Sequence, residues 1–428
     1  MPIADNLFIF PKNSNNIDRY ISDLQNFTPD ENLIKLIYSV NKKLKLSNVQ
    51  RENLKALYFD NIFICTTTIK PSFLGGAANT LLKILSVYIQ AELLKSRYKK
   101  YYFIPLVWID DDVHDNLESS TAYIFTKKGD IEAVRCSQDL SKTDRTVIHK
   151  RVFNKDIEKT IEQIIFNLPE TEGLEKLSGL LKQSYKPGNV WSYSTVLILN
   201  KIFKNLGILF LFTSFVRKEG FFNNLTAHEL SNRGKTYDLI KTKQMHYQKF
   251  NIEIPDKSHN YNLNIHKNDK VEKCDKISGS KFTDYSPNIM LKPVFLDSLL
   301  PVIFRISSPS EFIYSLLLDD VYSYFEIIKP LNLPRYSVTF MNKATKDFID
   351  ETNTDLKEII SGYNRLEKMF PHNISVKKAV NWLYPSGNLQ ERVLSLVNVV
   401  ASGRKQIIIR TAKKLKKLEP VKHFILEI

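Results

Sequence analysis

The chain has 428 residues, of which 43% are hydrophobic and 25% charged, and its formal net charge is +15. This composition is typical of a globular protein, and the length allows a sizeable core and at least two substructures. The chain does not open with a basic stretch and an apolar run, and its three cysteines are far apart and form no CxxC pair. The sequence therefore indicates neither a secretory signal, a disulfide framework nor a zinc site, and we expect a protein of the reducing cytoplasm.

The first part of the chain reads as a helical segment followed by an α/β unit. Apolar residues recur at helical spacing within 1–55. A strand is predicted at 62–67, a long helix at about 77–97 and a buried strand at 101–109. This order predicts a βαβ unit with a right-handed crossover, and therefore an α/β fold with a parallel sheet.

The middle of the chain alternates helical and strand patterns. Strands are predicted at 122–125 and 208–213, and helices at 155–167, 173–184 and 191–203, the last of them ended by Gly207. The apolar stretch 190–216 contains Asn200, Lys201, Lys204 and Asn205, which make it too polar to span a membrane. We therefore expect no membrane partner.

The second half of the chain is less regular. A polar segment at 233–281 has little periodicity and predicts an irregular or mobile insert. Helices are predicted at 343–370 and 388–402, and a last strand at 423–428.

An acidic cluster follows directly after the second predicted strand. Asp110, Asp111 and Asp112 are consecutive, and His114 and Asp115 follow after a single residue. Adjacent carboxylates repel one another, so their grouping at a strand end indicates a cation, an amine or a phosphate-bound metal as partner. Ligands of open α/β sheets bind beyond the carboxyl ends of the strands, which favours a site here. A solvated acidic turn is the alternative.

The loop before the long helix is the second candidate. It contains Gly75 and Gly76, and the helix start that follows contains Asn79 and Lys83. Backbone N–H groups and the helix dipole suit an anion at such a place, so we expect these four residues to hold phosphate or carboxylate. The loop matches neither GxGxxG nor a Walker A motif, and a plain glycine-containing turn is the alternative.

Polar residues of the second half complete the set of candidates. They are Asn288 and Lys292 in one loop, Ser308 and Glu311 in another, and Arg335 after Pro334. Fixed charges of this kind could hold a carboxylate or phosphate. The alternatives are a serine that caps a helix and an arginine in a surface ion pair.

Much of the positive charge lies at the end of the chain. Residues 401–428 contain eight Lys or Arg against two Glu, a net of +6. A run of this kind is most often a solvated helix face, and no DNA or RNA motif accompanies it. We therefore do not expect nucleic acid as a partner.

Several segments, taken in order, resemble the bacillithiol-biosynthesis cysteine-adding enzymes. The most specific is 286–301, which is close to the family pattern SPNVLLRPVxQDxLLP. The other segments that resemble family motifs are 75–83 (GGPLYTxYK), 105–115 (PxFWxxxEDHD), 191–212, 308–314 (GPxExxY), 334–337 and 387–393 (GxxQERV). The resemblance extends over residues 55–428.

The chain departs from the family pattern in one loop and in its helical arm. Residues 67–72 stand where the family has TGQQxG, and they contain neither its glycines nor its glutamines. Ala77 replaces the proline after the paired glycines, Val113 replaces one acid of EDHD, and Lys292 replaces the arginine of LLRP. The segment between Arg335 and the QERV motif is much shorter than in the family.

The resemblance implies a nucleotide-binding, Rossmann-like core with inserted connecting segments and a helical arm, here shortened. The organisation that follows is a helical segment at 1–55, the core at 56–342 with inserts near 130–190 and 215–285, the arm at 343–383, and a C-terminal helix and strand at 384–428. In the arm, the apolar positions of 343–370 form one broad face rather than a coiled-coil seam, so we expect a monomer or a weak dimer.

The resemblance also implies a reaction, in which cysteine is joined to the amino group of glucosaminyl-malate during bacillithiol synthesis. Asp112, His114 and Asp115 would orient or deprotonate the amine, because an ammonium cannot attack an acyl group until it loses a proton. ATP or ADP is the candidate nucleotide, and no metal is assigned. The alternative is a non-catalytic paralogue that keeps the fold and binds a ligand or partner.

Overall fold

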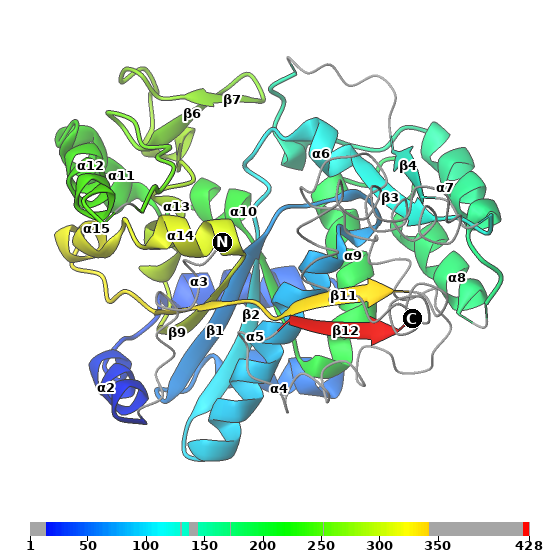
Figure 1. Ribbon diagram of the computed structural model, residues 1–428, viewed down its shortest axis with the longest axis horizontal. Coiled ribbons are helices and arrows are strands. Elements are labelled where there is room, and N and C mark those ends of the chain that lie inside the picture. Colours follow the sequence, from blue (N-terminus) through cyan, green and yellow to red (C-terminus); the bar gives the residue numbers. More distant parts are fainter. Residues whose placement is uncertain are drawn as a thin grey trace, which may run out of the picture.

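A five-stranded parallel sheet forms the centre of the protein, in the order β10-β9-β1-β2-β5 (Figure 1). The computed structural model describes residues 14–128, 131–136, 144–171, 173–250, 252–341 and 423–427. The strands of the sheet are β1 (Ile62–Ile69), β2 (Tyr102–Ile109), β5 (Leu209–Phe212), β9 (Val302–Ser307) and β10 (Leu331–Pro334). The expected α/β fold with a parallel, Rossmann-like core is confirmed.

The strand order reverses once within this sheet. From β1 the chain proceeds to β2 and β5 on one side, and then returns to β9 and β10 on the other side of β1. This is the order of the first five strands of a Rossmann fold, and it creates a switch point between β1 and β9. The connection that leaves β1 leads to β2, whereas the connection that leaves β9 leads to β10, in the opposite direction along the sheet. The carboxyl ends of β1 and β9 therefore border a crevice for a ligand.

Apolar side chains of the central strand pack on both faces of the sheet. Phe63 and Cys65 belong to a cluster with α2 (Ser14–Leu24) and α5 (Ala78–Arg97). Ile62 and Ile64 belong to the larger cluster, to which α3 (Glu31–Asn41) and α4 (Asn48–Ala56) contribute. Burial on both faces explains why the strands read as continuous apolar runs.

Two inserts flank the upper end of the sheet in Figure 1. The first contains α6 (Asn116–Ser120), β3 (Thr121–Phe125), β4 (Ile131–Arg135), α7 (Asp156–Asn167), α8 (Leu174–Ser184) and α9 (Trp191–Phe203). The second contains α10 (Thr213–Lys218), α11 (Asn223–Ser231), α12 (Lys235–Gln248), β6 (Leu263–Lys267), β7 (Lys270–Lys273), β8 (Tyr285–Pro287) and α13 (Lys292–Asp297). Helices α14 (Pro309–Ser315) and α15 (Asp319–Tyr324) connect β9 to β10.

The prediction of an irregular insert at 233–281 is wrong. This segment contains helix α12 and the hairpin of β6 and β7. Only Thr236 and Ile240 of α12 are buried, so its helical periodicity is weak in the sequence. Asn268 and Asp269 form the hairpin turn with φ of 48° and 61°, and such two-residue turns favour Asn and Asp because both positions need positive φ.

The last strand is confirmed as β12 (His423–Glu427), which pairs in parallel with β11 (Ser337–Met341). The arm predicted at 343–383, the helix predicted at 388–402 and the basic residues up to 422 lie outside the described residues, as do residues 1–13. The expectation of a monomer or a weak dimer therefore stays a prediction. Within the described ranges, no helix combines the length and apolarity that a membrane span needs.

Asn41, at the end of α3, covers the backbone of the outermost strand β5. Its amide nitrogen donates to the carbonyl of Phe210 at 2.8 Å, and its amide oxygen accepts from the Phe210 N–H at 3.0 Å. The side chain is fully buried. It thus satisfies a strand N–H and C=O that no other strand of the described sheet reaches, and an unpaired buried group of this kind would be costly.

We expect Asn41→Ala to lower the free energy of unfolding by about 2–3 kcal/mol, because it leaves a buried donor and a buried acceptor of β5 without partners. Urea denaturation measures the change. Ser39→Ala is the control, since Ser39 bonds only within α3, and it should change stability by less than about 0.5 kcal/mol. Equal losses in both variants would contradict this role for Asn41.

Candidate functional site

A cavity of about 1320 Å³ opens at the carboxyl end of the sheet. The residues that follow four of the strands line it: Lys70 after β1, Asp110 after β2, Ser308 after β9 and Arg335 after β10. Residues of both inserts complete its walls. The cavity therefore occupies the switch-point crevice that the strand order creates.

The structure brings together nearly all the candidate residues. Those that line the cavity are Gly76, Asn79, Lys83, Asp112, His114, Asp115, Asn288, Lys292, Ser308, Glu311 and Arg335. Gly75 is buried in the turn that precedes α5. The acidic cluster and the Gly75–Gly76 loop, which the sequence offered as two separate candidates, thus face one cavity.

The backbone of the glycine loop is left-handed at three consecutive residues, a conformation that favours glycine and that Leu74 also adopts here. Leu74, Gly75 and Gly76 have φ of 55°, 79° and 88°, and a Cβ on Gly76 would lie 2.8 Å from the hydroxyl oxygen of Thr80. The residue before α5 is Ala77, which provides no side-chain cap. The N–H of Thr80 donates to the carbonyl of Ala77 at 2.8 Å. The N–H groups that this helix start can offer to an anion are therefore those of Ala78 and Asn79.

Asp112 is held in a buried ion pair. Its two carboxylate oxygens accept from Nε and Nη2 of Arg217 at 2.8 and 3.0 Å, and Nδ1 of His149 lies 3.3 Å away. Burial alone would raise the pKa of Asp112, but the contacts with His149 and Arg217 outweigh it and hold this pKa well below its ordinary value. The expected role of Asp112 in orienting or deprotonating the amine stays a prediction; in this structure Arg217 binds both of its carboxylate oxygens.

Asp111 receives hydrogen bonds rather than a cation. Its carboxylate accepts from the N–H of Ser214 at 3.0 Å and from the hydroxyl of Ser214 at 2.9 Å. Burial and the neighbouring charge of Asp112 raise the pKa of Asp111 to about 6. These bonds tie the end of β2 to the start of α10.

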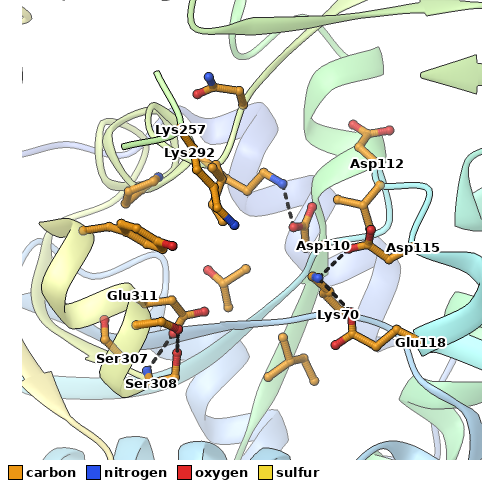
Figure 2. A pocket seen from close by; sticks show the side chains of 18 of the residues that line it. Lys70, Asp110, Asp112, Asp115, Glu118, Lys257, Lys292, Ser307, Ser308 and Glu311 are labelled. Carbon is orange, nitrogen blue, oxygen red and sulfur yellow. Dashed lines mark hydrogen bonds and ion pairs between the residues drawn. The ribbon is translucent and has the colours of Figure 1, made fainter. Parts of the chain in front are cut away.

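His114 and Asp115 lie on the more open side of the acidic turn. Asp115 and Glu118 both accept from Lys70, as Figure 2 shows. Arg145 contacts Nε2 of His114. Burial, together with the charge of Arg145, lowers the pKa of His114 below the ordinary histidine value, so this imidazole is neutral at pH 7 and can accept a proton.

Lys83 and Glu311 form an ion pair with each other across the switch point. The ammonium of Lys83 lies 2.7 Å from the carboxylate of Glu311 and donates to the carbonyl of Thr68 at 2.8 Å. Glu311 also accepts from the N–H of Ser308, which is the cap of α14. The pair joins α5 to α14, and the expectation that Lys83 helps to hold phosphate or carboxylate stays a prediction. The alternative for Ser308, a helix cap, is confirmed.

Asn288 and Lys292 differ in what they present to the cavity. The side-chain oxygen of Asn288 accepts from the N–H groups of Met290 and Leu291, and its nitrogen donates to Asn262 at 3.0 Å. Asn288 therefore shapes the turn before α13 rather than offering a free amide. Lys292, the first residue of α13, lies 2.6 Å from the carboxylate of Asp110.

Arg335 belongs to the rim of the cavity at the end of β10. Its N–H donates to the carbonyl of Ser307 at 2.9 Å, and its guanidinium donates to the carbonyl of Tyr336 at 3.0 Å. The first bond holds the ends of β9 and β10 together, so Arg335 reaches the cavity from a fixed backbone position.

Sequence reasoning named Lys292, which meets Asp110, but it missed the partners of Asp112 and Asp115. Lys70 follows β1 as Asp110 follows β2, so its place at a strand end was a usable signal. Arg217 and His149 lie in different parts of the chain from Asp112 and belong to no motif. Among the residues that the structure describes, no three His, Cys, Asp or Glu side chains are grouped so that they could hold a metal ion.

Comparison with known proteins identifies the family. The family model described as "Bacillithiol biosynthesis BshC, N-terminal Rossmann-like domain" matches residues 4–284, more than half of the chain. This chain belongs to the BshC family. The resemblance seen in the sequence is therefore confirmed.

Curated members of the BshC family match most of this chain at low identity. The "Putative cysteine ligase BshC" of Chlorobium phaeobacteroides is 22% identical over 383 residues, which cover 82% of this chain and 66% of the relative. The proteins of the same name from Chlorobaculum tepidum and Flavobacterium johnsoniae are 21% and 22% identical, over 75% and 84% of this chain and 61% and 70% of their own length. The chain thus spans about two thirds of the length of the curated relatives that it matches.

We expect Asp112→Asn to lower the free energy of unfolding by about 3 kcal/mol at pH 7, because it leaves Arg217 buried without a counter-charge. The pKa of Asp112 is depressed in the folded state, so its contribution is present above the unfolded pKa of about 4 and is lost as pH falls. Urea denaturation at several pH values between about 3 and 7 gives the free energy of unfolding of both proteins. The difference between Asp112→Asn and the unsubstituted protein should become smaller at low pH.

Asp115→Asn is the matched control for this measurement. The Asp115 side chain is 39% exposed, and ion pairs of that exposure contribute about 0–1 kcal/mol. Equal destabilisation by the two substitutions, or a difference that does not depend on pH, would contradict the buried-pair assignment.

Proposed function

We propose that this chain is a ligase-like enzyme of bacillithiol-type thiol synthesis, which adds cysteine to the amino group of glucosaminyl-malate. The observation that carries the proposal is the gathering of the acidic turn, the glycine loop and α13 around one switch-point cavity. Membership of the BshC family and relatives named as cysteine ligases support it. The substrates are therefore two small molecules, and the three buried free thiols of Cys65, Cys136 and Cys274 agree with a reducing cytoplasm.

The amine of the acceptor must lose a proton before it forms the amide bond. We assign His114 to take that proton, because its ring lines the cavity, and because burial and the charge of Arg145 lower its pKa and so keep the ring unprotonated. Arg145 holds Nε2 of His114 in the free protein, so the incoming amine would take its place. Asp115, ionised beside Lys70, would orient the ammonium before deprotonation.

ATP or ADP is the nucleotide that we propose for the opposite wall of the cavity. Its phosphates would lie at the start of α5, where the N–H groups have no cap and Gly76 has no side chain to block the approach. Asn79 faces the same space. When bound, the nucleotide would supply the activation of a carboxyl group that amide formation requires.

Thermal shift measurements with ATP, ADP, cysteine and glucosaminyl-malate test the proposal, since a ligand that binds only the folded state raises the melting temperature. Mass spectrometry of a mixture of all four should then detect cysteinyl-glucosaminyl-malate. A chain that binds ligands but forms no product, under conditions in which a full-length relative does, would be the non-catalytic paralogue instead.

We expect His114→Gln to reduce turnover about 10²–10⁴-fold, the range that a general base contributes. The melting temperature should change little, because His114 is only half-buried. In the unsubstituted enzyme, the acid limb of kcat/KM should lie below the ordinary histidine pKa of about 6.5, because the pKa of His114 is lowered. His246→Gln, in a histidine that contacts Tyr247 and Phe250 on or beside α12 and does not line the cavity, should leave turnover and the pH profile unchanged.

Two results would contradict this role for His114. One is turnover by His114→Gln within a factor of about two of the unsubstituted enzyme. The other is a His114→Gln variant with a much lower melting temperature whose remaining activity has the same acid limb as the unsubstituted enzyme. This result would indicate that His114 has a packing role.

A further inference from the structure

Asp110 and Lys292 form an ion pair that lines the cavity at the meeting point of β1, β2 and α13. The ammonium of Lys292 lies 2.6 Å from Oδ2 of Asp110, and Figure 2 shows the pair facing the cavity. The N–H of Asp110 donates to the carbonyl of Ile69 at 2.8 Å, which fixes Asp110 between the ends of two strands. Asp110 is 5% exposed, so the pair is a built part of the site rather than a surface contact.

The pair has unused hydrogen-bonding capacity on both sides. Oδ1 of Asp110 is buried and has no hydrogen-bond partner among the described residues. An ammonium has three donors, and within the described part of the chain the ammonium of Lys292 makes one hydrogen bond, to Asp110. A buried carboxylate oxygen without a donor is costly, so a ligand that supplies a donor to Asp110 and an acceptor to Lys292 would be stabilised.

The other buried carboxylates of the acidic turn are already satisfied. Asp111 accepts from Ser214, and Asp112 is held by Arg217. Among the buried acids of this turn, Asp110 is therefore the one with an oxygen that has no partner among the described residues. The neighbouring negative charges also oppose a phosphate at this place, whereas they favour a ligand with an ammonium group.

We propose that Asp110 and Lys292 bind the ammonium and the carboxylate, respectively, of a free α-amino acid. The ligand ammonium replaces the Lys292 ammonium at Asp110, and Lys292 turns to the ligand carboxylate, so that one internal ion pair becomes two. The inference rests on the proposed function, in which an amino acid is one of the two compounds joined, and it names the residues that would hold that compound.

The position of Lys292 also fits the chemistry of the site. Lys292 lines the same cavity as the proposed amine-handling residues His114 and Asp115. Burial raises the pKa of Asp115, but the charges of Lys70 and Lys292 are among those that lower it. A carboxyl group held by Lys292 would therefore be presented toward the amine that must attack it.

Isothermal titration with L-cysteine, with and without ATP, tests the assignment. Asp110→Asn and Lys292→Met should each weaken binding at least about tenfold, the loss expected when one charge-assisted hydrogen bond is removed. Lys243→Met is the matched control, because Lys243 pairs with Asp319 outside the cavity, and it should leave the affinity unchanged. Circular dichroism and melting temperature identify any variant that does not fold.

Two analogues separate the two contacts. Cysteamine lacks the carboxylate, so Lys292→Met should not weaken its binding further. 2-Hydroxy-3-sulfanylpropanoate has a hydroxyl in place of the ammonium, so Asp110→Asn should not weaken its binding further. This crossed pattern isolates each pairwise interaction, and a merely structural ion pair would weaken all three ligands alike.

Three outcomes would overturn the inference: no binding of L-cysteine by the native chain, folded variants that bind it with native affinity, or equal losses for all ligands. If Asp110→Asn does not fold, the unsubstituted chain still tests the inference. Equal affinities of that chain for cysteine and cysteamine would contradict it. Binding in the crossed pattern without product would refute the proposed function alone. Product formation with an unchanged KM for cysteine in Asp110→Asn would refute the inference alone.

Discussion

Consecutive carboxylates at the end of a buried strand must be compensated, and the organisation of the site follows from how this chain does so. Ionised groups are costly to bury unless each finds a counter-charge or hydrogen-bond donors. Asp110 meets Lys292, Asp111 meets donors of α10, and Asp112 meets Arg217. No two of these three acids share a cation, so the turn is held from several directions at once.

These partners come from segments that the sheet alone does not position. Arg217 lies in α10 and Lys292 in α13, both within the second insert, and His149 belongs to the first. The acidic turn therefore fastens both inserts over the carboxyl ends of the strands, and the cavity between them depends on charge pairing as well as on apolar packing. The acids divide accordingly: Asp112 maintains the scaffold, whereas His114 and Asp115 remain accessible to a ligand.

Much of the central sheet could be predicted because its strands are apolar runs that end abruptly at polar residues. The same feature predicted that the acidic turn follows the carboxyl end of one strand and the glycine loop that of another. The partners of the charged residues could not be predicted, because Lys83 and Glu311 are 228 positions apart and Asp112 and Arg217 are 105 apart. Helix α12 was missed because it buries too little apolar surface to leave a clear period.

The hydrogen bonds between Asn41 and the backbone of β5 have a consequence for folding during synthesis. An open strand edge is a template for pairing with another chain, and β5 becomes such an edge as soon as the sheet forms. Asn41 precedes Phe210 by 169 positions, and synthesis proceeds from the N-terminus. Helix α3, which carries Asn41, therefore leaves the ribosome well before β5. Asn41 can bond to Phe210 as soon as β5 emerges, before β5 meets a strand of another chain.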